Sequence, residues 1–457
     1  MRRGDCRLRW SWKDVAGPVR SGSRFRPLVL LLCGFILFSG LTAASAPARA
    51  GEFSLADFSD RLADAGLDYR GFIDLRGGRR LCQPVEERSS SLGEARLQLD
   101  LDYDMGWATA KFKSDLFADA IERTSGGTVR EAWILGSPLD FADLKVGRQI
   151  LTWGTGDLLF INDLFPKDWK SFFIGREDEY LKAPHDAARL SLYFDAANID
   201  IVYMPRFQPS VYINGQRLSY WSPMSGDIVG NDHVLRDHER HRWFSEDEIA
   251  VRIFRNFSGL EAALYFFDGY WKTPEGMMPD GRVYFPKLRS FGFSLRSDLC
   301  GGLANLEAGY YDSRDDNSGR NPMVRNSEWR LLAGFEHELG DDFTGSLQYY
   351  LEAIQHYDRY RESLPPEMRR RRRDHYRHLL TLRLTKLLLQ QNLTLSLFTY
   401  YSPSDADAHL RPQASYKVTD NWQVFAGANL FFGADDYTFF GQFEDNSNLY
   451  AGVRWNF

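Results

Sequence analysis

The sequence contains little cysteine and few long apolar runs. Of the four cysteines in 457 residues, only Cys82 and Cys300 lie after residue 50, and two cysteines are too few for a disulfide framework. The longest apolar run, 28–41, has about 14 residues, short of the roughly 20 that a membrane-spanning helix needs. Neither G-x-S-x-G nor H-E-x-x-H occurs, so we expect no enzymatic activity.

Residues 1–50 have the features of a secretory signal peptide. A basic segment that ends at Arg26 precedes the apolar run, and the spacing of Ala48 and Ala50 predicts a cut after Ala50. The shortness of the run disfavours the alternative, an uncleaved signal anchor. These residues hold nine of the 56 Lys and Arg and two of the 62 Asp and Glu, so 47 basic and 60 acidic residues follow, a net charge of −13. Such an acidic balance does not favour a nucleic-acid partner.

From Asp68 onward, segments of about ten residues alternate apolar and polar side chains, which is typical of strands with one apolar face. In the segment 94–103, every second residue is apolar: Ala95, Leu97, Leu99, Leu101 and Tyr103. About ten residues is the length that a tilted strand needs to cross an outer membrane. The pattern predicts an all-β fold, a transmembrane antiparallel β-barrel of about eighteen strands, with sixteen as the alternative. The predicted strands are 68–76, 94–104, 106–117, 128–136, 141–149, 185–195, 197–205, 247–255, 259–268, 288–298, 302–312, 327–338, 342–354, 376–386, 391–401, 408–417, 421–431 and 448–457.

The last ten residues follow the same pattern, with Leu449, Val453 and Trp455 on one face and Arg454 on the other. The chain ends on Phe457, which resembles the C-terminal signature of bacterial outer-membrane β-barrels, in which a final strand with a terminal Phe closes the cylinder. The resemblance implies an outer-membrane location, with membrane lipids and lipopolysaccharide as partners. We therefore divide the chain into a signal peptide (1–50), a periplasmic or lumenal N-terminal helix (51–67) and a transmembrane β-barrel (68–457).

Short and long connections alternate between the predicted strands. In an outer-membrane barrel, short turns face the periplasm and long loops face the exterior. Cys82 then falls in an outer loop and Cys300 in a periplasmic turn, so we predict no disulfide between them. The loop 150–184 is too rich in Leu, Phe and Trp to stay in solvent, and we expect it to fold back against the wall or into the lumen.

The strand that feeds this loop carries the pattern G-R-Q-x-x-x-W-G-x-G-D, from Gly147 to Asp157. The pattern resembles one of porin-like outer-membrane families that include the alginate-export type of eighteen-stranded barrel. Arg148, Gln149, Trp153 and Asp157 match it. The resemblance implies passive passage of a polar solute through a pore that inward loops narrow. A structural alternative stays open, in which the glycines only permit a tight bend and Arg148 pairs with Asp157 to hold the loop.

Arginines recur on the inward face of the predicted strands. They are Arg96, Arg189, Arg252, Arg296, Arg330, Arg383, Arg411 and Arg454. Lumenal guanidinium groups attract anions and bind carboxylate or phosphate through paired donors. Acidic residues share the same face, so a mixed lumen of weak selectivity is the alternative to an anion-selective pore: Asp100, Asp102, Asp200, Glu248, Glu261, Glu307, Glu336 and Glu352.

Two loop features and two alternative functions stay open. The run Arg369 to Arg373 either binds anionic groups at the channel mouth or is a solvated loop. The acidic loops 312–316 and 433–436 lack EF-hand spacing, and we expect no metal or other cofactor. The sequence predicts a porin-like channel for small polar or anionic solutes, with loop 150–184 as its constriction. The alternatives are a dedicated polysaccharide exporter and a barrel that carries an adhesive or enzymatic surface.

Overall fold

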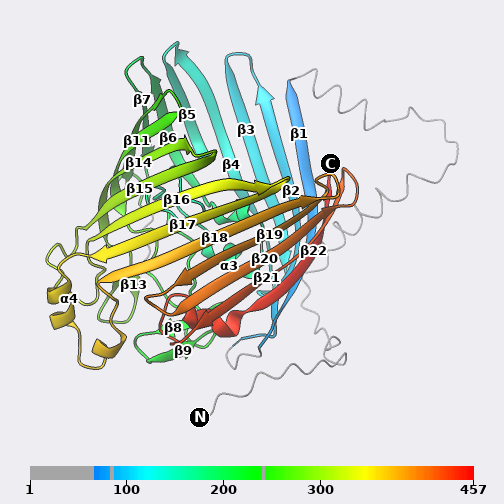
Figure 1. The fold of residues 1–457 in the computed structure, drawn as a ribbon. Coiled ribbons are helices and arrows are strands. Elements are labelled where there is room, and N and C mark those ends of the chain that lie inside the picture. The colour runs from blue at the N-terminus through cyan, green and yellow to red at the C-terminus, as the bar shows by residue number, and fades with distance from the viewer. Residues whose placement is uncertain (1–65, 83–86, 239–241) are drawn as a thin grey trace, which may run out of the picture.

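A closed antiparallel β-barrel of eighteen strands forms the body of the molecule (Figure 1). The computed structural model describes residues 66–82, 87–238 and 242–457. Each wall strand pairs with the strands before and after it, and the last strand pairs with the first. The predicted signal peptide, and the predicted N-terminal helix as far as residue 65, lie outside the described residues.

Each of the eighteen predicted segments overlaps one wall strand, so the prediction of eighteen strands is confirmed and the alternative of sixteen is wrong. The first nine wall strands are β1 (Leu67–Arg80), β2 (Ser90–Asp104), β3 (Ala108–Asp119), β4 (Thr124–Leu139), β5 (Ala142–Ile150), β6 (Pro184–Tyr193), β7 (Asn198–Met204), β10 (Glu248–Phe257) and β11 (Leu260–Tyr270). The other nine are β14 (Lys287–Leu299), β15 (Gly302–Ser313), β16 (Glu328–Gly340), β17 (Phe343–Ile354), β18 (Tyr376–Leu388), β19 (Leu393–Ser402), β20 (Asp407–Lys417), β21 (Trp422–Gly433) and β22 (Asn448–Asn456).

Some strands extend beyond their predicted bounds at the end of the barrel that carries the long loops. β4 begins at Thr124, four residues before the predicted start, and β1 continues to Arg80. The added residues Ser125 and Gly126 pair with β3 although neither is apolar. Backbone hydrogen bonds continue the ladder past the region in which side chains alternate, so alternation underestimates strand length.

Short turns gather at one end of the barrel and long connections at the other, as predicted. The turns lie at the upper end of the barrel in Figure 1, where the chain also ends. Two connections at the opposite end, 120–123 and 403–406, are as short as the turns. Cys300 lies in the turn between β14 and β15, whereas Cys82 follows β1 at the long-loop end.

The long loops carry small elements of their own. They are the helices α3 (Trp169–Ile174) and α4 (Tyr357–Ser363), the 3-10 helices η2 (Asp178–Leu181), η3 (Arg369–Arg371) and η4 (Gly441–Asn446), and two hairpins, β8 (Tyr220–Ser222) with β9 (Asp227–Val229) and β12 (Gly276–Met277) with β13 (Val283–Tyr284). Figure 1 shows α3 within the barrel and α4 outside it. In the described part of the chain, no helix has the length and apolar character needed to cross a membrane.

The closing strands β22 and β1 approach each other at the C-terminus. The backbone N–H of Gly71 donates to the carbonyl of Phe457, and the N–H of Phe457 donates to the carbonyl of Gly71, each at 3.0 Å. A Cβ atom on residue 71 would lie 2.6 Å from the Phe457 ring. Glycine at this position therefore lets the terminal aromatic residue pack against the first strand.

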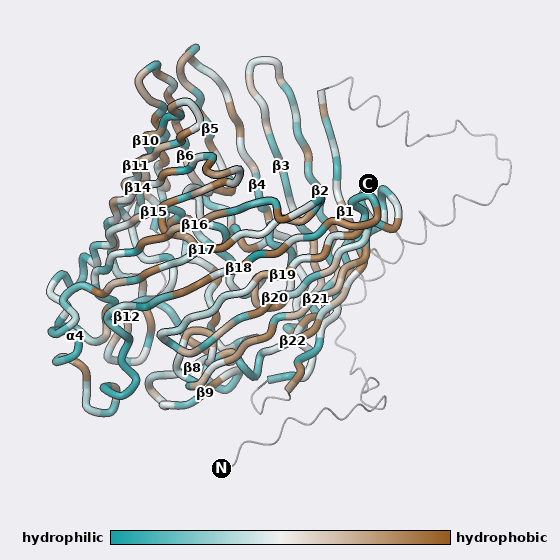
Figure 2. Tube along the Cα trace, in the orientation of Figure 1, coloured by the Kyte–Doolittle hydropathy of each residue, from teal (hydrophilic) through white to brown (hydrophobic). Residues whose placement is uncertain are grey.

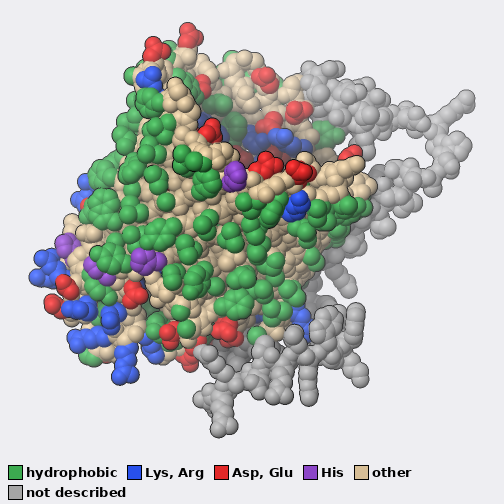
Figure 3. Space-filling view, in the orientation of Figure 1, with side chains coloured by type: hydrophobic (Ala, Val, Ile, Leu, Met, Phe, Trp, Pro, Cys, Tyr) green, Lys and Arg blue, Asp and Glu red, His purple; other side chains and the backbone are tan. Residues whose placement is uncertain are grey.

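The outward face of the wall is apolar. Exposed aliphatic and phenylalanine side chains include Ile134, Val146, Ile253, Leu264, Phe293, Leu306, Leu331, Leu347, Leu382 and Leu395. Figure 2 shows apolar residues along the strands and hydrophilic ones around α4, and Figure 3 shows the apolar side chains spread over the wall. Exposed aromatic residues lie toward the long loops (Trp329, Tyr376, Tyr401 and Phe432) and toward the turns (Tyr103, Tyr193, Tyr416 and Trp422). An apolar band between two aromatic girdles is the pattern of a transmembrane barrel.

The buried core lies inside the barrel, between the wall and the connection from β5 to β6. We call this connection, residues 151–183, the inner loop. Its buried apolar residues include Leu151, Ile161, Phe165, Phe172, Phe173, Ile174 and Leu181. They pack against inward side chains of the wall, among them Met204, Phe267, Tyr311, Leu379, Tyr400, Phe431 and Tyr450.

Candidate functional site

Glu307 of β15 holds the first half of the inner loop. Its carboxylate accepts hydrogen bonds from the backbone N–H groups of Thr155, Gly156 and Asn162 and from the side chains of Thr155 and Asn162. Gly154 turns the chain here with φ +82°, and a Cβ atom on it would lie 3.0 Å from Glu307 Oε1. The glycines of the sequence pattern thus let the backbone reach a buried carboxylate.

Asp157 makes the next attachment to the wall. Its backbone N–H donates to Gln348 Oε1 of β17, and Gln348 Nε2 donates to the Asp157 carbonyl, both at 2.8 Å. Its carboxylate forms a two-point ion pair with Arg383 of β18, with Nη2 donating at 2.8 Å. The Tyr400 hydroxyl of β19 then donates to the carbonyl of Leu158 at 2.9 Å. Four strands of the wall therefore hold this segment: β15 through Glu307, and β17, β18 and β19 through the contacts of Asp157 and Leu158.

The helix α3 follows in the middle of the inner loop. Asp168 caps its N-terminus by accepting from the backbone N–H of Ser171 at 2.8 Å and from its hydroxyl at 2.6 Å. Gly175 ends it in the left-handed conformation, with φ +89°. A Cβ atom on residue 175 would lie 2.3 Å from the ring of Tyr450 on β22. The helix end is therefore in direct contact with the wall.

A charged run, residues 176–179, ties the end of the loop to the strands that follow around the wall, from β20 to β3. Arg176 pairs with Glu94 of β2, and Asp178 pairs with Arg411 of β20 at 2.9 Å. Burial lowers the pKa of the Arg176 guanidinium, but Glu94, together with Asp168 and Asp119, holds this pKa above its usual value. Further ion pairs join Glu177 to Arg76 (3.1 Å) and Arg454 (2.7 Å), and Glu179 to Lys113 (3.4 Å).

Tyr180 lies between two arginines of the wall. The guanidinium carbons of Arg96 and Arg130 are 4.6 Å and 4.3 Å from the centre of its ring, and its hydroxyl accepts from Gln98 Nε2 at 3.1 Å. Burial raises the pKa of the Tyr180 hydroxyl above its ordinary value, so the side chain stays neutral.

The eight predicted inward arginines all lie on the inner face of the wall, and most are paired. Arg96 pairs with Asp115 (2.8 Å), Arg252 with Glu261 (2.7 Å), Arg330 with Glu328, Arg383 with Asp157, Arg411 with Asp178 and Arg454 with Asp74 (2.7 Å). Within the described ranges, Arg189 and Arg296 form no ion pair. Both lie in the half of the barrel nearer the turns.

The four residues of the sequence pattern lie in different surroundings. Arg148 shares a face of β5 with the exposed Leu144 and Val146, so it lies on the outer wall. It pairs with Asp186 at 3.0 Å instead of Asp157, which excludes the predicted Arg148–Asp157 pair. The neighbouring Gln149 is fully buried on the inner side and donates to the carbonyl of Ala187 at 3.0 Å.

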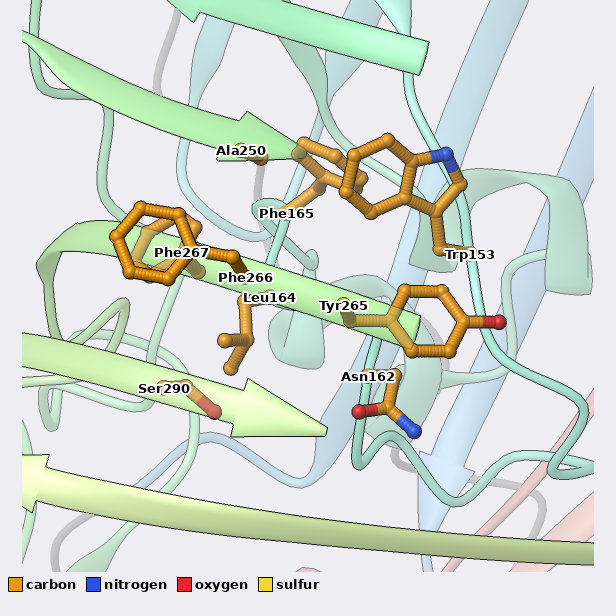
Figure 4. A pocket seen from close by; sticks show the side chains of 9 residues that line it. All are labelled: Trp153, Asn162, Leu164, Phe165, Ala250, Tyr265, Phe266, Phe267 and Ser290. Atoms are coloured by element: carbon orange, nitrogen blue, oxygen red, sulfur yellow. The ribbon is translucent and has the colours of Figure 1, made fainter. Parts of the chain in front are cut away.

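Trp153, the third residue of the pattern, packs inside the barrel. Its ring meets Phe165 edge to face, with centroids 5.0 Å apart, and lies 6.0 Å from the ring of Tyr265. Figure 4 shows these side chains around a void of about 10 Å³, together with Asn162 and others from β10, β11 and β14. A void of this size is about one water molecule, so Trp153 fills space between loop and wall. Asp157, the fourth residue, binds Arg383 as described above.

Arg217 lies on the connection from β7 to β10, and its role inside the barrel was not predicted from the sequence. It is almost fully buried, pairs with Asp119 of β3 and donates to the carbonyl of Ser91 at 3.1 Å. The nearby Ser219 accepts from Asn446 of η4 at 2.9 Å. This second loop therefore also crosses the lumen. No periodicity marks a single arginine in a long loop, so the sequence carries no signal for it.

A cavity of about 550 Å³ lies between the inner loop and the wall on the long-loop side. We call it the outer cavity. Its apolar lining includes Leu158, Phe160, Trp169, Phe172, Leu379 and Tyr400, and its basic lining includes Lys167, Lys272, Arg325, Arg371, Arg372, Arg373 and Arg377. Figure 3 shows basic side chains gathered beside α4 at this end of the molecule.

Several basic groups of the outer cavity are held by carboxylates. Arg325 contacts Glu328 at 3.0 Å and Glu352 at 3.1 Å, and Arg373 contacts the same two glutamates. Burial lowers the pKa of Arg325, but its neighbouring glutamates hold it above the ordinary value. Among the described residues, no group of three or more His, Cys, Asp or Glu is placed to hold a metal ion, and the acidic loops 312–316 and 433–436 are included in that statement.

Solved structures that share this fold include two bacterial proteins. OccK5 (OpdH) of Pseudomonas aeruginosa is 10% identical over 85% of this chain and 97% of its own, with a TM-score of 0.51. OccAB3 of Acinetobacter baumannii is 10% identical over 86% of this chain and 99% of its own, also with a TM-score of 0.51. No family model matches the sequence, and no curated protein matches it.

The closed eighteen-stranded barrel, its apolar outer band and these structural likenesses define the class of the protein. It is a transmembrane antiparallel β-barrel with the fold of porins. At identities this low, the two bacterial structures share their fold with this chain, and the site must be interpreted from its own residues.

Proposed function

We propose that the protein is an outer-membrane channel for passive passage of small polar or anionic solutes, and that the inner loop narrows its lumen. The observation that carries the proposal is the course of this loop. The loop starts at β5 and returns to β6, and in between its residues bond to β15, β17, β18 and β19 and then to β20, β22, β1, β2 and β3. A segment attached to so much of the circumference lies across the lumen.

The attachments favour a fixed constriction. Charge-assisted hydrogen bonds are stronger than neutral ones, and the loop residues Asp157, Arg176, Glu177 and Asp178 all form them with the wall. A barrel of eighteen strands is wide enough for an aqueous channel, so an internal loop is what sets its width.

The proposed pore residues are those of the predicted set that lie on the inner side. They are Gln149, Trp153, Asp157, Arg96, Arg189, Arg252, Arg330, Arg383, Arg411 and Arg454. Arg148 is omitted because it lies on the outer wall. Paired arginines contribute little net charge. In the half of the lumen nearer the turns, the inward Arg189 and Arg296 would attract anions and the inward carboxylate of Glu336 would oppose them.

The proposed location is the bacterial outer membrane, reached through the predicted signal peptide. The apolar band would contact lipid acyl chains, and the aromatic girdles would lie at the two interfaces. At the exterior, the run Arg369 to Arg373 would face lipopolysaccharide phosphates or anionic solute.

Single-channel recording in a planar bilayer tests the proposal, using folded protein from Gly51 onward in asymmetric KCl. Steady open steps are expected, and the sign of the reversal potential reports whether the arginines or the carboxylates dominate the lumen. Replacing Arg189 and Arg296 by Gln should move the reversal potential toward cation preference. Silence from a correctly folded barrel would reject the channel and favour an adhesive or enzymatic surface.

A further inference from the structure

We propose that the outer cavity binds an amphipathic organic anion, a solute with an apolar body and a carboxylate head. This inference rests on the proposed function, because it names the class of solute that the channel takes up. It goes beyond a preference for charge, since it requires an apolar part of the ligand. Two features of the cavity carry it: an apolar floor and a pair of arginines that form no ion pair.

The floor consists of apolar side chains that are only partly buried. Leu158, Phe160 and Trp169 of the inner loop line the cavity and keep part of their surface accessible. The rings of Phe160 and Trp169 meet edge to face, with centroids 6.0 Å apart. A small polar solute gains nothing from such a surface, whereas each methylene group buried on it strengthens binding roughly fourfold.

The rim supplies two guanidinium groups that are not paired with a carboxylate. Arg371 lies 4.7 Å from the ring centre of Trp221, and Arg372 donates to the carbonyl of Arg369 at 3.0 Å. Neither arginine forms an ion pair with any carboxylate in the described ranges, while Arg325 and Arg377 are paired with acidic residues.

The local charge favours an anion. The rim also carries Asp374, but Arg371 and Arg372 together outnumber it. An arginine binds a carboxylate through two parallel hydrogen bonds, which fixes the orientation of the head group. The apolar body of the ligand then extends toward Trp169.

The size of the cavity fits a small molecule. Its volume of about 550 Å³ falls within the roughly 300–1,000 Å³ of ordinary ligand sites. A phenylalkanoate with several methylene groups is a suitable probe, because the length of its apolar part can be changed while its charge stays constant.

The test uses the full chain from Gly51 onward in a planar bilayer, with phenylalkanoates from phenylacetate to 8-phenyloctanoate added on the long-loop side. Interruptions of the current report the residence time of each probe. We expect residence times to rise with chain length, roughly fourfold per methylene until the cavity is filled. Acetate should cause no resolvable interruption.

Two variants separate the head group from the body. The double variant Arg371→Ser/Arg372→Ser should shorten the residence of 8-phenyloctanoate at least tenfold and leave that of 8-phenyloctan-1-ol unchanged. The matched control is Arg369→Ser/Arg370→Ser, which removes the same charge from the same run at positions that do not line the cavity. Trp169→Ala should make the residence time of the phenylalkanoates rise less steeply with chain length.

Residence times that do not depend on length, or that fall equally in the control variant, would overturn the inference while leaving the channel intact. Loss of all conductance would instead reject the proposed function. In that case, tryptophan fluorescence of the protein in lipid nanodiscs, titrated with the same probes, still measures binding in the outer cavity. Saturable quenching that becomes stronger with probe length would support the inference. Absence of such quenching would overturn the inference.

Discussion

Glu307 is the residue on which the first half of the inner loop depends. It lies on the wall, is almost fully buried, and accepts five hydrogen bonds from three loop residues. A carboxylate offers two oxygens as acceptors and no donor, which matches the N–H and hydroxyl groups that face it. An amide in its place would turn a donor toward those groups.

Glu307→Gln should therefore loosen residues 154–162 without unfolding the barrel. A lost charge-assisted hydrogen bond costs roughly 1.5–3 kcal/mol, which corresponds to about 10- to 150-fold faster amide exchange. Hydrogen exchange at Thr155 and Gly156, followed by mass spectrometry, measures this. Glu336→Gln is the control, because Glu336 is an exposed inward carboxylate near the turns. Equal exchange in the two variants would contradict the role of Glu307.

The side of the wall on which each side chain lies could be predicted from the sequence, whereas its partner across the lumen could not. Alternation placed Glu307 and Arg383 on the inner face, where the structure has them. It gave no information on which loop group meets each of them, because Asp157 and Arg383 are 226 positions apart. For Arg148, alternation was the better guide. The sequence pattern assigned Arg148 to the pore, but Arg148 alternates in step with the exposed Leu144 and Val146, which places it on the outer face.

The helix α3 holds the inner loop at the middle of its course. Six residues form a helix too short to be stable alone. It persists because Asp168 caps its start, Gly175 ends it, and Phe172, Phe173 and Ile174 are buried against the wall. The apolar content of loop 150–184 predicted that it would leave solvent, but the position of the helix depends on wall residues far away in the sequence.

Gly175→Ala tests this element. An L-residue in the left-handed conformation costs about 1–2 kcal/mol, and the new Cβ would also meet the Tyr450 ring. We expect a lower midpoint of thermal unfolding and brief current fluctuations as residues 176–179 leave the wall. Gly259→Ala is matched, since Gly259 has φ +97° in a short turn with open space around it. A quiet current in Gly175→Ala, with a stability loss no greater than the control's, would contradict the anchoring.

The whole molecule is a cylinder with its apolar surface outside and much of its charge inside. Eighteen strands could be predicted because each one repeats the same alternation over about the same length. The extended strand ends and the crossing of the lumen by Arg217 could not, because backbone ladders and long-range ion pairs leave no periodic trace.

Leu264→Arg tests the membrane face of the cylinder. Leu264 is exposed near the middle of β11, and an arginine at the midplane of a bilayer costs about 2–4 kcal/mol in a transmembrane barrel. Urea titration of folding into lipid vesicles measures the loss. Val418→Arg, in the turn between β20 and β21, should have an effect of about 0–1 kcal/mol. Similar small effects at both positions would contradict a lipid-facing band.

Replacing residues 158–181 by a short Gly-Ser linker tests most directly whether the inner loop sets the width of the channel. We expect small steady steps from the parent protein and severalfold larger steps from the variant, because the same barrel then has a wider opening. Replacement of 357–363, which removes α4 outside the barrel, should leave the steps unchanged. Steps of equal size with and without the inner loop, or no steps from either protein, would contradict the account.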